Sequence, residues 1–232
     1  MYKRQYLSFL CINFDVPVVK EAASWFLNAV FLNYNSSYLE RMLEQLLNED
    51  DSPEVTRFLR AVDVRIDGFR VERAPEWRGQ RLFVRHEVSG KAYELRLSEE
   101  SAGTQKLMGL AAYLMTALER GGTVVVDELD AKLHPKLLRY VILLFKDPEV
   151  NKSGAQLIFS SQDVSTMRND VFRRDEIWFA ARGEGEASQL WSLADIHEAN
   201  GNLVSKNAAF DKQYLSGRYG ADPYLTRIEE WD

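Results

Sequence analysis

The chain has 232 residues, of which 46% are hydrophobic, enough to fill the core of one substantial domain or two small ones. Charged residues make up 28% and the formal net charge is −6 at pH 7, which argues against a dedicated nucleic-acid binder. The single cysteine, Cys11, excludes an internal disulfide framework and indicates a reducing compartment. No apolar run approaches the roughly 18 residues of a membrane helix, so we expect a globular, cytoplasmic protein.

The first 62 residues have the hydrophobic spacing of helices. Apolar residues recur at helical intervals from Val16 to Leu32, and again in the segment 36–49. Ser52-Pro53 is a typical helix start, and this short helix is expected to run to Val62. We interpret residues 1–62 as a helical lobe.

An antiparallel β segment is predicted over residues 63–100. The segments 64–73, 81–88 and 93–97 alternate apolar and polar residues, as half-buried strands do. Turn signals lie between them, with Ser89-Gly90 the clearest.

From Ser101 the pattern becomes that of an α/β sheet with helices on both faces. Helices are predicted over 101–120 and 135–145, and strands over 123–128, 155–161, 176–180 and 189–193. We interpret residues 101–195 as this α/β core and 196–232 as a polar tail that wraps over the surface. Ligands of such sheets bind at the carboxyl ends of the strands.

Two adjacent carboxylates, Asp127 and Glu128, end the apolar strand that begins at Thr123. This is a Walker B pattern, in which the first acid holds magnesium and the second accepts a proton from the attacking water. The alternative is an ordinary strand that runs into a solvated loop, since acids often follow buried strands.

A candidate anion site precedes that strand, and polar residues follow the next one. Ser101, Gly103 and Gln105 open a helix whose first turn has free backbone N–H groups. The alternative is a plain helix cap made by Ser101. The strand at 155–161 leads into Ser160–Asp163 at the same predicted edge, or into a simple strand-to-helix turn.

In this order the segments resemble the second half of an ABC ATPase head of the SMC-like and OLD-like branch. Ser101-Ala102-Gly103 is similar to the signature, Asp127-Glu128 to Walker B, 129–134 to the D-loop and 159–163 to the switch segment. More narrowly, the chain resembles the bacterial abortive-infection ATPases filed under the AAA name. That resemblance also rests on the following segments: E-S-x-G-T-Q at 100–105, L-H-P at 133–135, R-R-D-E-I-W-F at 173–179, S-L-A-D-I at 192–196 and G-R-Y-G-A-x-P at 217–223.

The resemblance implies a P-loop NTPase-like fold, ATP and Mg²⁺ as ligands, and ATP hydrolysis between two protomers, in phage defence beside a toxic effector. It also implies roles for single residues. Those residues are Glu128 and Gln162 for catalysis, Asp127 for the metal, and Ser101, Gly103, Gln105, Asp130 and His134 for the nucleotide and the dimer interface.

The sequence departs from the family pattern at two points. No G-x-x-x-x-G-K-[ST] occurs, because the Gly90-Lys91 pair lacks the earlier glycine and is followed by Ala92. The sequence thus looks incomplete at its N-terminus: a fragment, a truncated gene or half of a split protein, inactive alone. Gln162 stands where the family usually has histidine, and glutamine cannot take a proton near neutral pH.

Three functions follow from these observations. The first is an ABC-type ATPase that needs a missing Walker A segment. The alternative is a catalytically inactive dimerisation or effector-binding module. A nucleic-acid clamp is disfavoured by the acidic balance.

Other residues are expected to be structural. Arg173-Arg174 is interpreted as a solvated turn rather than a phosphate contact, and His86 as a surface histidine. Core positions are predicted for the aromatic residues Trp25, Phe26, Phe31, Trp178 and Trp191.

Overall fold

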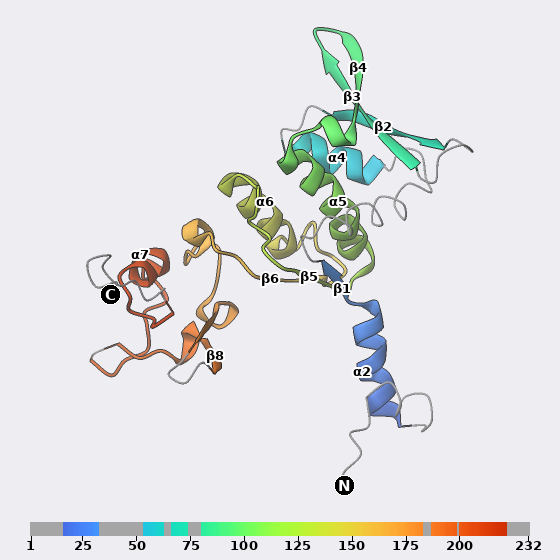
Figure 1. Ribbon diagram of the computed structural model, residues 1–232. Coiled ribbons are helices and arrows are strands. Elements are labelled where there is room, and N and C mark those ends of the chain that lie inside the picture. The colour runs from blue at the N-terminus through green and yellow to red at the C-terminus, as the bar shows by residue number, and fades with distance from the viewer. Residues whose placement is uncertain are drawn as a thin grey trace, which may run out of the picture. The chain divides into compact units, whose positions relative to one another are not determined.

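The computed structural model describes residues 16–32, 53–62, 66–73, 80–182, 187–198 and 200–221 (Figure 1). The chain divides into two compact units, Met1–Gln162 and Asp163–Asp232. The predicted helix at 36–49 and the segment around Cys11 lie outside the described residues. Within the described parts, no helix is long and apolar enough to cross a membrane.

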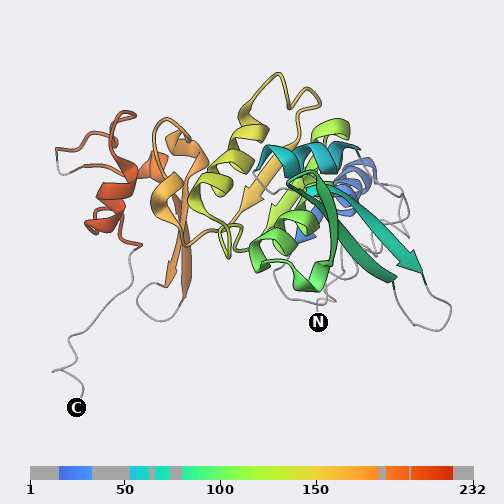
Figure 2. The same cartoon turned by 90° about the horizontal axis from the view of Figure 1, so that it is seen from above.

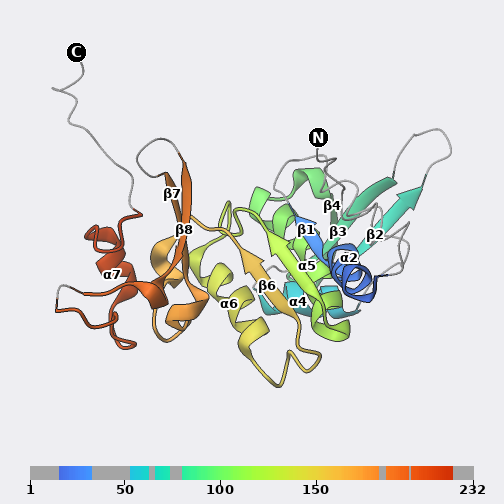
Figure 3. The same ribbon diagram turned by 90° about the horizontal axis from the view of Figure 1, so that it is seen from below.

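The centre of the first unit is a parallel sheet of three strands in the order β1-β5-β6 (Figure 3). The strands are β1 (Val30–Leu32), β5 (Thr123–Val126) and β6 (Gln156–Phe159). Helices α5 (Ala102–Arg120) and α6 (Pro135–Lys146) pack against them and bury their apolar stripes. The α/β fold with helices flanking a parallel sheet is therefore confirmed.

The segment before the sheet differs from its prediction. Helix α2 (Pro17–Asn28) ends four residues before Leu32, and β1 takes up the rest of the predicted helix. Val30–Leu32 pair in parallel with Val124–Val126, so these backbone groups are satisfied by the sheet instead of a helical turn. The helical periodicity could not reveal this, because a short apolar run suits a buried strand equally well.

The predicted antiparallel strands are confirmed as a second sheet (Figure 2). It consists of β2 (Ile66–Arg73), β3 (Gln80–Val88) and β4 (Lys91–Arg96), in that order. Helix α4 (Pro53–Ala61) packs against α5 and β2, and Phe58 and Leu59 are buried there. The predicted helix at 53–62 is thus present too.

One face of the parallel sheet is only partly covered among the described residues. Phe31, Val125 and Ile158 are neighbours in register on this face, and Phe31 and Ile158 are 48% and 50% exposed. The core placement predicted for Phe31 is wrong, as are those for Trp25, Phe26 and Trp178, which are 42%, 55% and 57% exposed. Trp191 is partly buried against the core of the second unit.

The second unit is built on a hairpin that is separate from the parallel sheet. Strands β7 (Trp178–Arg182) and β8 (Ser188–Ser192) pair antiparallel with each other, and α7 (Phe210–Leu215) follows. The core of this unit consists of Ile177, Phe179, Leu193, Val204, Phe210 and Tyr219. Residues after Ile196 therefore contribute to a core, in contrast to the surface tail expected from their polarity.

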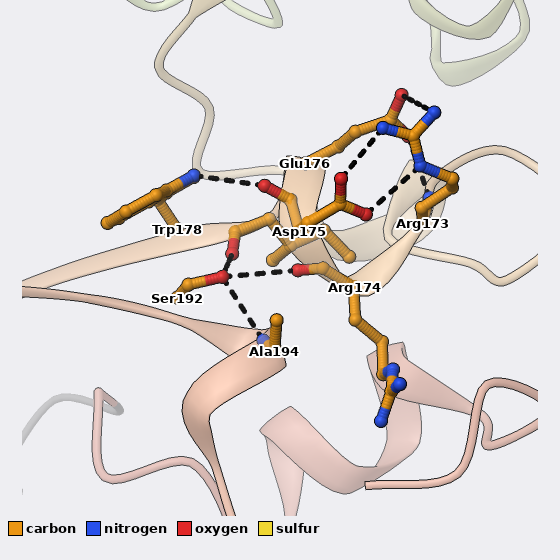
Figure 4. A network of polar contacts seen from close by, with 8 residues as sticks. Arg173, Arg174, Asp175, Glu176, Trp178, Ser192 and Ala194 are labelled. Carbon is orange, nitrogen blue, oxygen red and sulfur yellow. Dashed lines mark hydrogen bonds and ion pairs between the residues drawn. The ribbon is translucent and has the colours of Figure 1, made fainter. Parts of the chain in front are cut away.

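The R-R-D-E-I-W-F segment is tied into this unit by polar contacts (Figure 4). Arg173 donates two hydrogen bonds to Asp175, at 3.0 and 2.7 Å, and the Asp175 carbonyl accepts from the Trp178 indole at 3.2 Å. The Ser192 hydroxyl accepts from Ala194 N–H at 3.1 Å, and Arg174 donates to the Val204 carbonyl at 2.5 Å. These contacts give the motif a structural role. Arg173 is exposed, as predicted for a solvated turn, whereas Arg174 is partly buried and bonded to the Val204 carbonyl.

Candidate functional site

An acidic turn, residues 127–132, follows β5 at the carboxyl end of the parallel sheet. Strand pairing ends at Val126, and the Asp127 N–H donates to the Leu32 carbonyl of β1 at 2.9 Å. Glu128 then adopts a left-handed backbone with φ 51°, which is unusual for a residue with a side chain. Because the chain leaves the extended conformation here, the alternation that would send Asp127 and Glu128 to opposite faces ends, and both side chains are exposed.

Ser160, the first residue after β6, contacts the carboxylate of Asp127 and the backbone of Glu128. Its hydroxyl donates to Asp127 Oδ1 at 2.5 Å and accepts from the Glu128 N–H at 2.8 Å. Its carbonyl accepts from the Leu129 N–H at 3.0 Å. The serine was noted in the sequence only as a polar residue at the sheet edge, and the contact follows from the parallel pairing of β5 with β6.

Asp130 and Gln162 meet at the same edge. The Gln162 N–H donates to Asp130 Oδ2 at 3.2 Å, while the Gln162 side chain is exposed. Asp130 Oδ1 is buried and has no hydrogen-bond partner among the described residues. The structure thus brings the predicted D-loop acid next to the predicted switch residue.

The start of α5 lies against the acidic turn. Ser101 caps the helix, since its hydroxyl accepts from the Thr104 N–H at 3.1 Å, and the Gln105 amide donates to the Glu100 carbonyl at 2.8 Å. These local bonds are those of the plain helix cap. A Cβ on Gly103 would come within 2.8 Å of the Lys132 carbonyl oxygen, so the glycine permits close approach of the helix to the turn.

A buried lysine on α5, missed by sequence reasoning, reaches into the turn. Lys106 is 6% exposed, and its Nζ donates to the carbonyl oxygens of Glu128 at 2.6 Å and Ala131 at 2.8 Å. Burial lowers the pKa of Lys106 to about 8, and the charges of Asp130 and Glu128 oppose that shift. The available signal was a lone cation immediately before the apolar run 107–112.

The two histidines near the site have local roles. His134 is the cap of α6, where its Nδ1 accepts from the Lys136 N–H at 3.2 Å, and its side chain is exposed. His86 was expected on the surface, but its Nε2 lies 2.6 Å from Glu100 Oε1 and its side chain is only 16% exposed. This pair joins β3 to the residue before the signature segment.

The exposed oxygens of the acidic turn suit a hard cation such as Mg²⁺. This ion is usually bound by one or two carboxylates together with water and substrate phosphates. The described residues contain no group of three or more His, Cys, Asp or Glu that could hold a metal ion. Asp127 and Glu128 lie where strand ends of an α/β sheet bind ligands.

Comparison with protein families gives a match over residues 11–168 to the family described as "AAA domain, putative AbiEii toxin, Type IV TA system". Comparison with curated proteins gives no match.

Three similar solved structures are SMC ATPases. One, from work on "ATP-driven dimerization and DNA stimulated activation of SMC ATPases", has a TM-score of 0.43 and 14% identity over 67% of this chain and 88% of its own. The Pyrococcus yayanosii Smc head with a coiled coil and joint has a TM-score of 0.44 and 19% identity over 69% of this chain and 28% of its own. The Pyrococcus furiosus Smc head bound to the C-terminal domain of ScpA has a TM-score of 0.41 and 17% identity over 82% of this chain and 44% of its own. The chain thus spans less than half the length of the last two.

Proposed function

The chain belongs to this family of AAA domains, and from that premise we propose that it supplies the acidic half of a site that binds and hydrolyses ATP. The observation that carries the proposal is the acidic turn itself. Asp127 and Glu128 are exposed at the carboxyl end of β5, held in place by Ser160, beside the first turn of α5.

The roles of the two acids follow from their surroundings. Asp127 shares its Oδ1 with the Ser160 hydroxyl, which fixes the carboxylate at the end of the strand, and we assign it to the metal. A bound Mg²⁺ neutralises charge on the phosphates of the nucleotide. Glu128 has its N–H and carbonyl held while its side chain is exposed, so its carboxylate is the group available to orient the attacking water and accept its proton.

A phosphate-binding loop must be added to this half. The 232 residues contain no G-x-x-x-x-G-K-[ST], and we propose that a segment outside this sequence supplies it. The loop has to lie at the carboxyl end of the sheet, where Asp127 lies. A parallel strand added beside β6 would bring the loop that follows it to that end. Among the described strands β6 pairs only with β5, and Ile158 of β6 is half exposed.

Self-association completes the proposed site. Backbone N–H groups at the start of a helix favour an anion, so Ser101 and Gly103 of one protomer would face the γ-phosphate held by another. Gln105, Asp130 and His134 would line the interface between the two. A role in phage defence beside an effector protein is part of the proposal by family resemblance.

The second candidate is a module that no longer hydrolyses ATP. Gln162 favours it, because an amide at the switch position can hydrogen-bond a phosphate or water but cannot take up a proton. In that case the acidic turn would serve nucleotide-dependent or constitutive dimerisation.

Calorimetry with ATP and Mg²⁺ tests the proposal, with the isolated chain compared with a two-part assembly. That assembly is this chain together with a segment that carries the phosphate-binding loop, supplied in cis or as a separate polypeptide. The isolated chain should bind ATP weakly or undetectably and release no phosphate, since the loop provides most of the contacts to the phosphates. The assembly should bind ATP and release phosphate. Micromolar binding and turnover by the isolated chain would show that the site is misassigned, and binding without turnover by the assembly would favour the inactive module.

A further inference from the structure

We propose that Lys106 is a positioning residue that holds the acidic turn in shape and links it to the first turns of α5. The effect on catalysis rests on the proposed function, whereas the effect on the turn does not. Its hydrogen bonds to the acidic turn go to backbone carbonyl oxygens.

The contacts of Lys106 are those of a clamp. Its ammonium group donates to the carbonyl oxygens at both ends of one chain reversal, Glu128 and Ala131. Only 6% of the residue is exposed, so water cannot easily replace the lysine as the donor to these oxygens. The donor is a charged group, and charge-assisted hydrogen bonds are stronger than those between neutral groups.

The backbone conformation of Glu128 explains why a clamp is needed. Its φ of 51° is disfavoured for a residue with a Cβ and persists only where neighbouring groups fix it. The Ser160 hydroxyl accepts from the N–H of Glu128, and Lys106 donates to its carbonyl. The two peptide groups that flank Glu128 are therefore held from opposite sides, by β6 and by α5.

The same clamp joins the turn to the segment that resembles the signature. Lys106 lies one helical turn after Gly103. The backbone of Gly103 lies so close to the Lys132 carbonyl oxygen that a Cβ would not fit between them. Lys132 itself has φ 61°. A displacement of the start of α5 would therefore be transmitted to Glu128 through packed backbone, without a contact between the nucleotide and Lys106.

Hydrogen exchange on the isolated full chain tests the clamp directly. Lys106→Met keeps an unbranched side chain of similar length and removes the donor, and Lys152→Met makes the same exchange at an exposed site. We expect amides of 127–133 to exchange roughly tenfold faster or more in Lys106→Met, because a charge-assisted bond is lost. Exchange in β2 and β3 should stay unchanged, and Lys152→Met should match the wild type. Unchanged exchange at 127–133, or a uniform rise across the first unit, would overturn the proposal.

Chemical rescue separates the ammonium group from simple packing. Lys106→Cys, made with Cys11→Ser because Cys11 is the chain's only native cysteine, is treated in denaturant with bromoethylamine and refolded, which rebuilds a lysine-like amine. Protection of 127–133 should be low before treatment and return afterwards. If the untreated variant is fully protected, or the treated one stays unprotected while the rest of the unit refolds, the clamp assignment is wrong.

In the two-part assembly, Lys106→Met should lower kcat and leave the Kd for ATP nearly unchanged, since the lysine holds the backbone of the turn that carries Glu128. A parallel loss of ATP binding would contradict this. Absence of turnover in the wild type would count against the proposed function and leave the exchange and rescue results standing.

Discussion

Glu128 is held by different segments on its two sides. The Ser160 hydroxyl after β6 accepts from its N–H, and Lys106 on α5 donates to its carbonyl. Its carboxylate is left exposed. A residue with a fixed backbone and a free acid group is suited to place a water molecule reproducibly.

Burial of Lys106 should make the stability of the first unit depend on pH. Its pKa in the folded chain is lowered to about 8 from 10.5, chiefly by burial; the charges of Asp130 and Glu128 oppose the shift, and that of Lys132 adds to it. Between these two values the unfolded chain binds more protons than the folded chain, so the free energy of unfolding rises with pH across this window.

The measurement is urea unfolding of the wild type and Lys106→Met at one pH below 8 and one near 10. The wild type should gain stability relative to the variant at the higher pH. An equal difference at the two pH values would show that Lys106 does not titrate in this window.

At the scale of elements, helix α5 and the acidic turn approach each other closely at Gly103. Alanine is favoured over glycine within a helix by about 1 kcal/mol, so Gly103→Ala would be stabilising on propensity alone. The new Cβ would lie 2.8 Å from the backbone oxygen of Lys132, which cannot rotate away. Overpacking of this kind costs about 1–3 kcal/mol, and we expect Gly103→Ala to be destabilising on balance.

Chemical denaturation checks this, with Glu119→Ala on the exposed last turn of α5 as the control. The control should change stability little. A Gly103→Ala variant that is more stable than the wild type would mean that the helix and turn are further apart than described.

The elements that carry the site follow from their sequence patterns, and the contacts between them do not. Periodicity predicted α5, β5, α6 and β6, and adjacent acids at a strand end predicted the acidic turn. These local patterns could not predict that Ser160 and Lys106 both contact Glu128, because each contact joins residues more than twenty positions apart. The prediction that the helix continues to Leu32 is wrong, because residues 30–32 pair with β5 even though their apolar spacing also suits a helix.

At the scale of the whole molecule, the chain divides into two compact units, and the described residues of the second unit include a core of its own. Phe210 is 1% exposed in the core of the second unit, where sequence polarity had suggested a surface tail. The sequence pattern places strands β7 and β8 in the α/β core, whereas they pair only with each other among the described strands, because pattern alone cannot tell which sheet a strand joins.

Phe210→Ala should destabilise the second unit alone. Truncation of a buried phenylalanine costs about 3–5 kcal/mol, so amides of β7 and β8 should lose protection. Those of β5 and α5 should keep it if the two cores are independent. Leu215→Ala, at a residue that is 70% exposed, is the control and should change neither. Equal loss of protection in both units would show a single cooperative core.

The central claim is that Glu128 is the carboxylate that activates water, and a turnover assay on the two-part assembly tests it most directly. The assay compares wild type, Glu128→Gln and the exposed control Glu149→Gln, with size-exclusion runs in ATP and Mg²⁺ alongside. Glu128→Gln keeps the size and hydrogen bonding of the side chain but removes the proton acceptor. Hydrolysis should fall by about 10²–10⁴-fold, while ATP binding survives and the ATP-bound dimer lasts longer. Glu149→Gln should behave as wild type. A further variant, Asp127→Asn, should reduce hydrolysis and, unlike Glu128→Gln, should weaken the magnesium-dependent binding of ATP. A Glu128→Gln assembly that hydrolyses ATP at the wild-type rate would contradict the claim.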